Sequence, residues 1–491
     1  MGSVKQETVS GAKWLLLQKL TLQPLQFVYS MVLARLITPM EMGIVGLTAV
    51  FFAVATTLAS AGFGSALIRK IERTEIDCDT AFWFNLGMSL LMSAVLFIAA
   101  PWFVEFYQQP ELLWLTRCSA VMMFLVSTAS VHWTLYTARR NFKVPAIIQT
   151  TSTIISMPVC LMLAYMGWGV WALMCGTLTS SLISLVWVWI VSPWRPRWQF
   201  SYASFRELFG FGSKLAVAGI ISTLFSNLRT FIVGKFYSPA DLGMYVKGAH
   251  LGMMPPDLIN GILGTVTYPI LATLQNDRER LISVYRKYIR VATLPIAFGC
   301  MLVAALAEPI VWVCFGEQWM PCVIFVQLVS AAMMFDHVST INLSLLQVLG
   351  RSDILLWLEI AKKTILLLLI LYAATISVPA MCSVSLVYGQ IAIFFNTYFT
   401  GKFLGLTWWR QQKDYMPYVI WALIACVPAW VCTLTDWHAI VQLTVGGIVS
   451  FLLYFGGLHL LRDAAYAELY GMVRQKLRNR WLPPMKERSL Q

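Results

Sequence analysis

Basic side chains within long apolar stretches are the residues of this sequence best placed to bind a ligand. Arg229 lies near the middle of the stretch 207–233, and Lys247 lies in the next one, 242–270. Ionisable groups are costly in an apolar environment, and those that occur there usually serve a function. Because Lys and Arg bind phosphate through charge and hydrogen bonds, these positions predict a site for an anionic, phosphate-bearing ligand. The candidate ligand-binding residues are Arg229, Lys247, Lys19, Arg117, Lys362, Arg35 and Lys235.

Acidic and imidazole groups in the same kind of stretch are candidates for coupling to an ion. Asp336 and His337 predict either a proton or cation relay or a hydrogen-bonded structural pair. Glu359 precedes Lys362 and Lys363 by three and four residues, which is also the spacing of a local ion-paired turn on a helix. The coupling-ion candidates are Asp257, Asp336, His337 and Glu359. For Lys19, an alternative to ligand binding is extension of the ammonium to the inner membrane surface.

Motifs for catalysis and for metal binding are missing from the sequence. It contains no GxSxG, HExxH or Walker A motif, and its ten cysteines include no CxxC pair. We therefore expect no enzyme activity, no cofactor and no metal site. Without an ATP site, any transport draws on an ion gradient or on consumption of the product on the far side.

The elements that carry these residues are predicted to be membrane-spanning helices. The chain is 58% hydrophobic and 12% charged, whereas soluble domains are about 25% charged. Residues 80–104 carry no charge at all, and about 20 apolar residues suffice to cross a bilayer. We predict an all-α polytopic membrane protein with fourteen spans, near 14–35, 42–67, 81–104, 112–136, 145–166, 170–192, 207–233, 242–270, 291–313, 322–347, 354–376, 380–402, 415–434 and 438–461.

Basic residues gather at every second connection between the predicted spans, which sets an orientation. Of the 36 Lys and Arg residues, 28 fall on one side of the predicted membrane. By the positive-inside rule this side is cytoplasmic, and both termini lie there. The net charge of +13 is then mostly a topology signal, which argues against nucleic-acid binding and leaves attraction to anionic membrane lipids. The basic tail, 463–491, predicts either a helix lying on the membrane surface or a solvated segment.

A motif that occurs twice indicates an internal repeat. "LARLITPMEMG" spans residues 33–43, and "VGKFYSPADLG" spans residues 233–243. Each copy ends a span with a basic residue, and then begins a helix with Ser or Thr, Pro, an acidic residue and Gly. Six spans separate the copies, so both point the same way through the membrane. Parallel repeats are a transporter architecture, with the substrate site between the halves and alternating access. Arg35 and Lys235 would lie at equivalent places on the rim of that site.

The repeat predicts how the chain is divided. We expect a first lobe over 1–200 and a second lobe over 201–405, each with six helices. An additional helix pair follows over 406–462, and then the basic tail 463–491.

Several segments resemble one family. "SGAKW" (10–14), the stretch 32–70 and the stretch 233–281 are similar to the bacterial polysaccharide flippases of the O-antigen, capsule and colanic-acid type, and "FGEQWMPCVIFVQLVS" (315–330) resembles a later stretch of the same proteins. These belong to the multidrug/oligosaccharidyl-lipid/polysaccharide exporter superfamily. The resemblance implies a V-shaped, two-lobed helix bundle with a cationic central cavity in the bacterial inner membrane. It implies transfer of undecaprenyl-diphosphate-linked oligosaccharide from the cytoplasmic to the periplasmic leaflet for lipopolysaccharide or exopolysaccharide synthesis, with the polysaccharide polymerase and chain-length machinery as further partners.

Two other functions stay open. A multidrug or cation antiporter of the same fold would use an acidic cavity, whereas six basic and three acidic residues lie well inside the predicted spans, away from their ends. A glycan polymerase or ligase would need a large outer loop with catalytic Arg or His, and the outer connections here are short.

Overall fold

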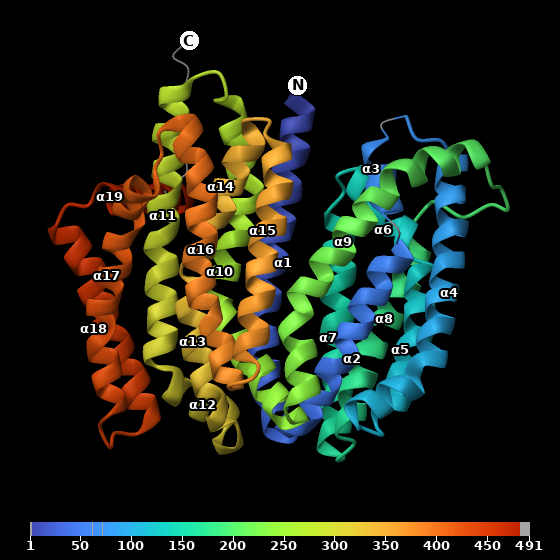
Figure 1. Ribbon diagram of the computed structural model, residues 1–491, viewed down its shortest axis with the longest axis horizontal. Helices are drawn as coiled ribbons and strands as arrows, with labels where there is room; N and C mark the ends of the chain where they lie inside the picture. The colour runs from blue at the N-terminus through green and yellow to red at the C-terminus, as the bar shows by residue number, and fades with distance from the viewer. Residues whose placement is uncertain (1, 61, 71, 482–491) are drawn as a thin grey trace, which may run out of the picture. The chain divides into compact units, whose positions relative to one another are not determined.

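The computed structural model describes residues 2–60, 62–70 and 72–481, and within these ranges it contains helices and no strand. The predicted all-α class is confirmed. In chain order (Figure 1) the elements are α1 (Gly2–Leu36), α2 (Pro39–Ser60), α3 (Phe63–Arg69), α4 (Glu75–Tyr107), α5 (Leu112–Ser127), α6 (Ser130–Ala138), α7 (Lys143–Tyr165), α8 (Val170–Val191), α9 (Tyr202–Phe236), α10 (Pro239–Thr273), α11 (Arg278–Ala305), α12 (Ala307–Phe315), the 3₁₀ helix η1 (Glu317–Cys322), α13 (Val323–Met333), α14 (Asp336–Val348), α15 (Ser352–Ala373), α16 (Val378–Leu404), α17 (Trp408–Thr433), α18 (Ala439–Leu460) and α19 (Ala464–Trp481).

Most of these helices can cross a membrane. Among the described residues, ten helical segments are long and apolar enough, and the bent pair of α5 and α6 makes up to eleven. The remaining long helices, α1, α10 and α15, coincide with three more predicted spans, but they include residues whose side chains are not described. The count of fourteen therefore stays a prediction. Of the predicted tail 463–491, α19 is described, and residues 482–491 lie outside the described part of the chain.

Several predicted spans are interrupted rather than continuous. The predicted span 42–67 divides into α2 and α3 around Gly62, whose φ of 71° is left-handed, and a side chain at Gly62 would collide with the carbonyl oxygen of Gly212. The predicted span 291–313 divides into α11 and α12, since Pro309 lacks the N–H that would bond to the Ala305 carbonyl. The span 112–136 bends by 45° between α5 and α6.

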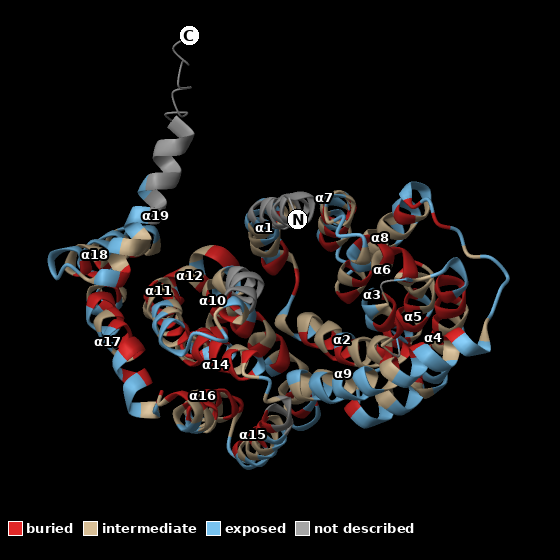
Figure 2. Ribbon diagram, turned by 90° about the horizontal axis from the view of Figure 1, so that it is seen from above, coloured by how far each residue is buried: buried red, intermediate tan, exposed pale blue. Residues whose placement is uncertain are grey.

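The chain forms two compact units, Met1–Val246 and Lys247–Gln491. In the first unit, α7 packs against α1 and α8, while α2 packs against α4, α5 and α9. In the second unit, α11 packs against α13 and α17, and α17 packs against α18. Buried residues lie on the sides of these helices that face neighbouring helices of the same unit (Figure 2). The lobe boundaries at 200 and 405 stay a prediction.

The two copies of the repeated motif fold in the same way at the starts of α2 and α10. The Thr38 N–H donates to the Glu41 carboxylate (2.7 Å), and the Glu41 N–H donates back to the Thr38 hydroxyl (3.3 Å). Ser238 and Asp241 repeat both bonds, at 3.2 and 3.1 Å. These reciprocal bonds form a capping box, which satisfies N–H groups that a helix start leaves unpaired. The predicted helix start at each copy is confirmed.

The two copies also contact each other, within the first unit. A Cβ atom built on Gly43 would lie 1.8 Å from the carbonyl oxygen of Pro239, and one built on Gly243 would lie 1.8 Å from that of Pro39. The contact is therefore reciprocal, as a local two-fold relation between the copies requires. Only glycine allows the two backbones to approach this closely.

Candidate functional site

A polar sector crosses the middle of α9, and Arg229 belongs to it. Its members recur at spacings of three and four residues, which places them on one side of the helix. Ser222 and Ser226 are exposed, and the Thr223 hydroxyl oxygen lies 3.2 Å from that of Thr57 on α2. α2 therefore covers one edge of this side and leaves the other open. The α9 polar sector consists of Ser222, Thr223, Ser226, Asn227, Arg229 and Thr230.

Arg229 carries a buried hydrogen-bond donor that the described protein does not satisfy. The side chain is half-buried, and no described residue accepts a hydrogen bond from its Nε–H. An unpartnered buried donor costs about 1–3 kcal/mol, and more when the group is charged. Arg229 therefore offers an unmet charge and an unmet donor beside an exposed row of hydroxyl groups, which is what an anionic ligand requires.

Arg117 lies in a different environment on α5. Its guanidinium lies 4.9 Å from the ring centroid of Phe97 and 5.1 Å from that of Trp114. Cation–π contacts of this kind stabilise a charge without an anion. The charge of Arg117 is thus covered by aromatic side chains of α4 and α5, while its buried Nε–H has no described partner.

Three further predicted residues lie on the surface of the first unit. Lys235 donates from Nζ to the carbonyl oxygen of Phe106 (2.7 Å), in the last turn of α4. A cation at a helix C-terminus is favoured by the helix dipole, so this contact fastens α9 to α4. Arg35 is exposed in the last turn of α1, and Lys19 is exposed further back on the same helix.

Lys247 begins the second unit and is almost fully covered. Its side chain is 3% exposed. Nζ lies 4.2 Å from the ring centroid of Phe315, at the end of α12, and 5.6 Å from that of Trp319 in η1. The two aromatic rings cover the ammonium group of Lys247 in this conformation. Contact between Lys247 and a ligand stays a prediction.

Lys362 and Glu359 form an ion pair on α15. Nζ of Lys362 lies 2.5 Å from Oε1 of Glu359. The lysine side chain is 3% exposed and the glutamate side chain 39%. The local ion-paired turn, one of the two interpretations of this spacing, is confirmed.

The coupling-ion candidates divide into two places in the second unit. Asn260 on α10 donates from Nδ2 to the Asp336 carboxylate (3.3 Å), and Asp257, one turn earlier, lies within electrostatic reach of Asp336. The Asn260 carbonyl oxygen is buried without a described partner. The structure therefore brings together two carboxylates and an unused amide oxygen.

His337 is separate from this group. It is fully buried, and its Nε2 lies 2.7 Å from the Thr293 hydroxyl on α11. Asp336 therefore bonds to α10, and its neighbour His337 bonds to α11. Adjacent residues on a helix point in different directions. Whether the two serve as an ion relay or as a structural pair stays a prediction.

Comparison with known proteins identifies the family. The family model described as "Polysaccharide biosynthesis protein" matches residues 32–324. The chain belongs to the polysaccharide biosynthesis protein family.

Relatives of this family member carry names from several polysaccharide systems. The teichuronic acid biosynthesis protein TuaB of Bacillus subtilis is 24% identical over 80% of this chain and 81% of its own length. The succinoglycan biosynthesis transport protein ExoT of Rhizobium meliloti is 27% identical over 65% of this chain and 64% of its own. These relatives differ in the polysaccharide that their names state.

Solved structures show the fold of the family member. The lipid II flippase MurJ in an inward closed conformation superposes with a TM-score of 0.71 at 11% identity, over 93% of this chain and all of its own. An inward-facing multidrug resistance transporter of the MATE family superposes with a TM-score of 0.60 at 14% identity, over 78% of this chain and 95% of its own. At such identities the likeness establishes the fold and leaves the transported molecule open.

For this polysaccharide biosynthesis protein, sequence reasoning missed the hydroxyl and amide neighbours of Arg229. Ser222, Thr223, Ser226 and Asn227 are uncharged, so a search for ionisable residues passes over them. Their helical spacing in "STLFSNLRT" was a usable signal, because polar residues on one side of a spanning helix line a polar space.

Proposed function

We propose that this protein is a flippase for undecaprenyl-diphosphate-linked oligosaccharide. It carries the repeat unit from the cytoplasmic to the periplasmic leaflet of the bacterial inner membrane by alternating access. The lipid chain stays in the membrane while basic residues hold the diphosphate. The periplasmic polysaccharide polymerase and chain-length machinery then receive the unit. Family membership, the names of the relatives and the fold support this proposal.

One observation carries the proposal at the site. Arg229 and Arg117 each keep a buried Nε–H without a described partner. The Arg117 guanidinium lies over two aromatic rings, whereas Arg229 lies in the α9 polar sector, and Lys235, Lys247 and Lys362 contact protein groups. A diphosphate supplies the acceptor oxygens that Arg229 lacks. Beside it, the Ser222 hydroxyl can donate to a phosphate, and the Ser226 hydroxyl, which donates to the Ser222 carbonyl oxygen, can accept from a sugar hydroxyl. A cationic drug would instead be repelled by Arg229, so the geometry favours the flippase over the antiporter.

Substitution at Arg229 tests this proposal directly. We expect Arg229→Ala to lower export of the polysaccharide at least tenfold, because one charge-assisted contact to phosphate contributes about 1.5–3 kcal/mol. Arg206→Ala on the same helix, at an exposed position, is the matched control and should export normally. Membrane levels of each variant are measured alongside surface polysaccharide. Normal export by Arg229→Ala, or loss of drug resistance in its place, would contradict the proposal.

A further inference from the structure

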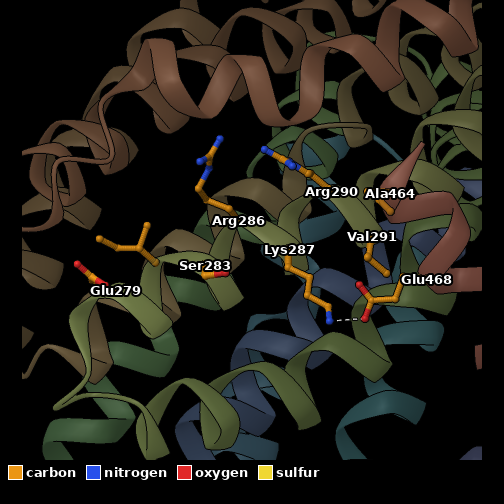
Figure 3. A pocket seen from close by; sticks show the side chains of 10 residues that line it. Glu279, Ser283, Arg286, Lys287, Arg290, Val291, Ala464 and Glu468 are labelled. Carbon is orange, nitrogen blue, oxygen red and sulfur yellow. Dashed lines mark ion pairs between the residues drawn. The ribbon is translucent and has the colours of Figure 1, made fainter. Parts of the chain in front are cut away.

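A basic pocket lies between α11 and α19 of the second unit (Figure 3). It has a volume of about 340 Å³. Arg286 and Arg290 extend to one side of α11, while Lys287 turns away from them and pairs with Glu468 of α19. The charged residues that line the pocket are Glu279, Arg286, Lys287, Arg290 and Glu468.

Arg286 and Arg290 share a single carboxylate. Arg286 donates to Asp414 of α17 from Nε and Nη2, each at 2.8 Å, and Arg290 donates to the same carboxylate from Nε (2.8 Å) and Nη2. The Asp414 side chain is fully buried, whereas the two arginine side chains are 40% and 38% exposed. Two cations against one anion leave one positive charge at this place.

Both guanidinium groups keep donors for a ligand. A guanidinium has five N–H donors, and the bonds to Asp414 use Nε and Nη2 of each arginine. The Nη1 groups have no partner among the described residues. Two adjacent arginines that are fixed by a buried carboxylate form a rigid pair of forks, which suits the oxygens of a phosphate.

The other charged side chains around the pocket do not cancel the net positive charge of the two arginines and Asp414. Lys287 and Glu468 neutralise each other in their own ion pair. Glu279 is exposed and precedes Arg286 by seven residues, or about 10 Å along the helix. Since this is close to the screening length at physiological ionic strength, Glu279 weakens the arginine pair only slightly.

The pocket lies at the boundary of the apolar part of α11. Charged residues occur on α11 up to Arg290, and residues 291–305 carry none, a run of about 22 Å. α19 is fixed beside the pocket through Asp463, which accepts from the Tyr466 N–H (2.8 Å) and from the Tyr418 hydroxyl of α17 (2.9 Å). The arginine pair thus lies where a spanning helix enters the headgroup region, on the side predicted to be cytoplasmic.

We propose that this pocket binds the phosphate of an anionic membrane-lipid headgroup. Basic pockets at the cytoplasmic ends of spanning helices recognise such headgroups. The apolar lining residues Ile282, Val291 and Ala465 contact the glycerol and upper acyl chain, and the arginine pair contacts the phosphate. No residue of the α9 polar sector lines the pocket, so it regulates or anchors the protein whatever the transported molecule is.

Lipid binding to the purified full-length protein tests this site. Native mass spectrometry in detergent compares phosphatidylglycerol with phosphatidylcholine. We expect wild type to prefer phosphatidylglycerol, and Arg286→Gln or Arg290→Gln to lower its affinity about tenfold, the size of one lost charge-assisted contact. Each single variant leaves one arginine on Asp414, which protects folding. The control Arg280→Gln changes an exposed arginine of α11 outside the pocket and should bind as wild type does.

Two further arms separate lipid binding from a structural role and from binding of free phosphate. Asp414→Asn keeps an oxygen that accepts from the guanidinium groups and removes the negative charge, so the net charge of the cluster rises and the proposal expects tighter phosphatidylglycerol binding. A purely structural clamp would instead lose lipid binding together with folding. Inorganic phosphate at the same concentration should not displace the lipid. Equal affinities in Arg286→Gln, Arg290→Gln and Arg280→Gln, weaker binding by Asp414→Asn, or displacement by inorganic phosphate would each overturn the proposal.

Discussion

At the residue scale, the partners of a buried cation separate a structural role from a ligand-binding one. Lys362 has Glu359, and Lys247 has aromatic rings, whereas Arg229 keeps a buried donor without a described partner. Sequence position alone treats all of them as costly charges in an apolar stretch. The distinction depends on neighbours that lie far away in the sequence, such as Phe315 and Trp319 for Lys247.

The Lys362–Glu359 pair gives a stability prediction. Glu359→Gln leaves Lys362 buried without its anion, and we expect this to cost about 1–3 kcal/mol, since the Glu359 side chain is 39% exposed and water screens the pair. Lys362→Met removes the buried charge and should cost much less. Thermal unfolding of the purified proteins in detergent measures both changes. The double variant should recover most of the loss, and a lower melting temperature for Lys362→Met than for Glu359→Gln would refute this role of the pair.

The two carboxylates beside Asn260 give a coupling prediction, which rests on the proposed transport. We expect Asp336→Asn to remove the dependence of transport on a proton or sodium gradient, because it removes one of the two charges that can hold the ion. Transport into vesicles, with and without each gradient, is the measurement. Asp436→Asn, at an exposed position, serves as the control. An unchanged gradient dependence in Asp336→Asn would exclude this group as the coupling site.

At the element scale, the repeated motif gives both helix starts and a crossing point. The capping boxes at Thr38 and Ser238 begin α2 and α10, and these starts could be predicted from Ser or Thr followed three residues later by an acidic residue. The reciprocal contact of Gly43 and Gly243 could not be predicted from the sequence. A glycine after a cap is compatible with many neighbours, and only the tertiary structure shows that each copy packs against the other.

Alanine at these glycines tests the crossing point. A methyl group at Gly43 or Gly243 would lie 1.8 Å from a carbonyl oxygen, far inside van der Waals contact, so the two backbones must move apart. We expect Gly43→Ala and Gly243→Ala each to cost about 3 kcal/mol or more, at the upper end for overpacking. Gly87→Ala on α4 is the matched control, because a Cβ atom there meets nothing within 4 Å. The melting temperatures of the purified variants measure these costs. Melting temperatures of Gly43→Ala and Gly243→Ala equal to that of wild type would rule out the close contact.

Helix positions were largely predictable from hydropathy, while helix interruptions were not. Uncharged stretches such as 80–104 correspond to helices, here α4, because the apolar length of a spanning helix is fixed by the bilayer. The break at Gly62 depends on packing against Gly212, which hydropathy does not contain. Pro309 indicated that a helix could end near this position. Proline also occurs inside α4 and α7, so its presence alone does not predict a helix end.

At the scale of the whole molecule, two compact units meet in sequence between Val246 and Lys247, inside α10. The reciprocal contact of the repeated motif lies at the start of this helix, and the covered Lys247 follows it. The division of the chain into two compact units supports the proposal that transport involves movement of one part against another. The two lobes and the cytoplasmic position of both termini stay predictions from the repeat and from the distribution of basic residues.

The location of the lipid-linked oligosaccharide tests the central claim most directly. Cells that lack this protein are compared with cells that carry wild type or Arg229→Ala, and the lipid-linked intermediate is assigned to a leaflet by its accessibility to a membrane-impermeant label. We predict accumulation in the cytoplasmic leaflet in the deletion strain and in Arg229→Ala, with wild-type protein restoring periplasmic exposure. Periplasmic exposure of the intermediate in the deletion strain would contradict the claim that this protein is the flippase.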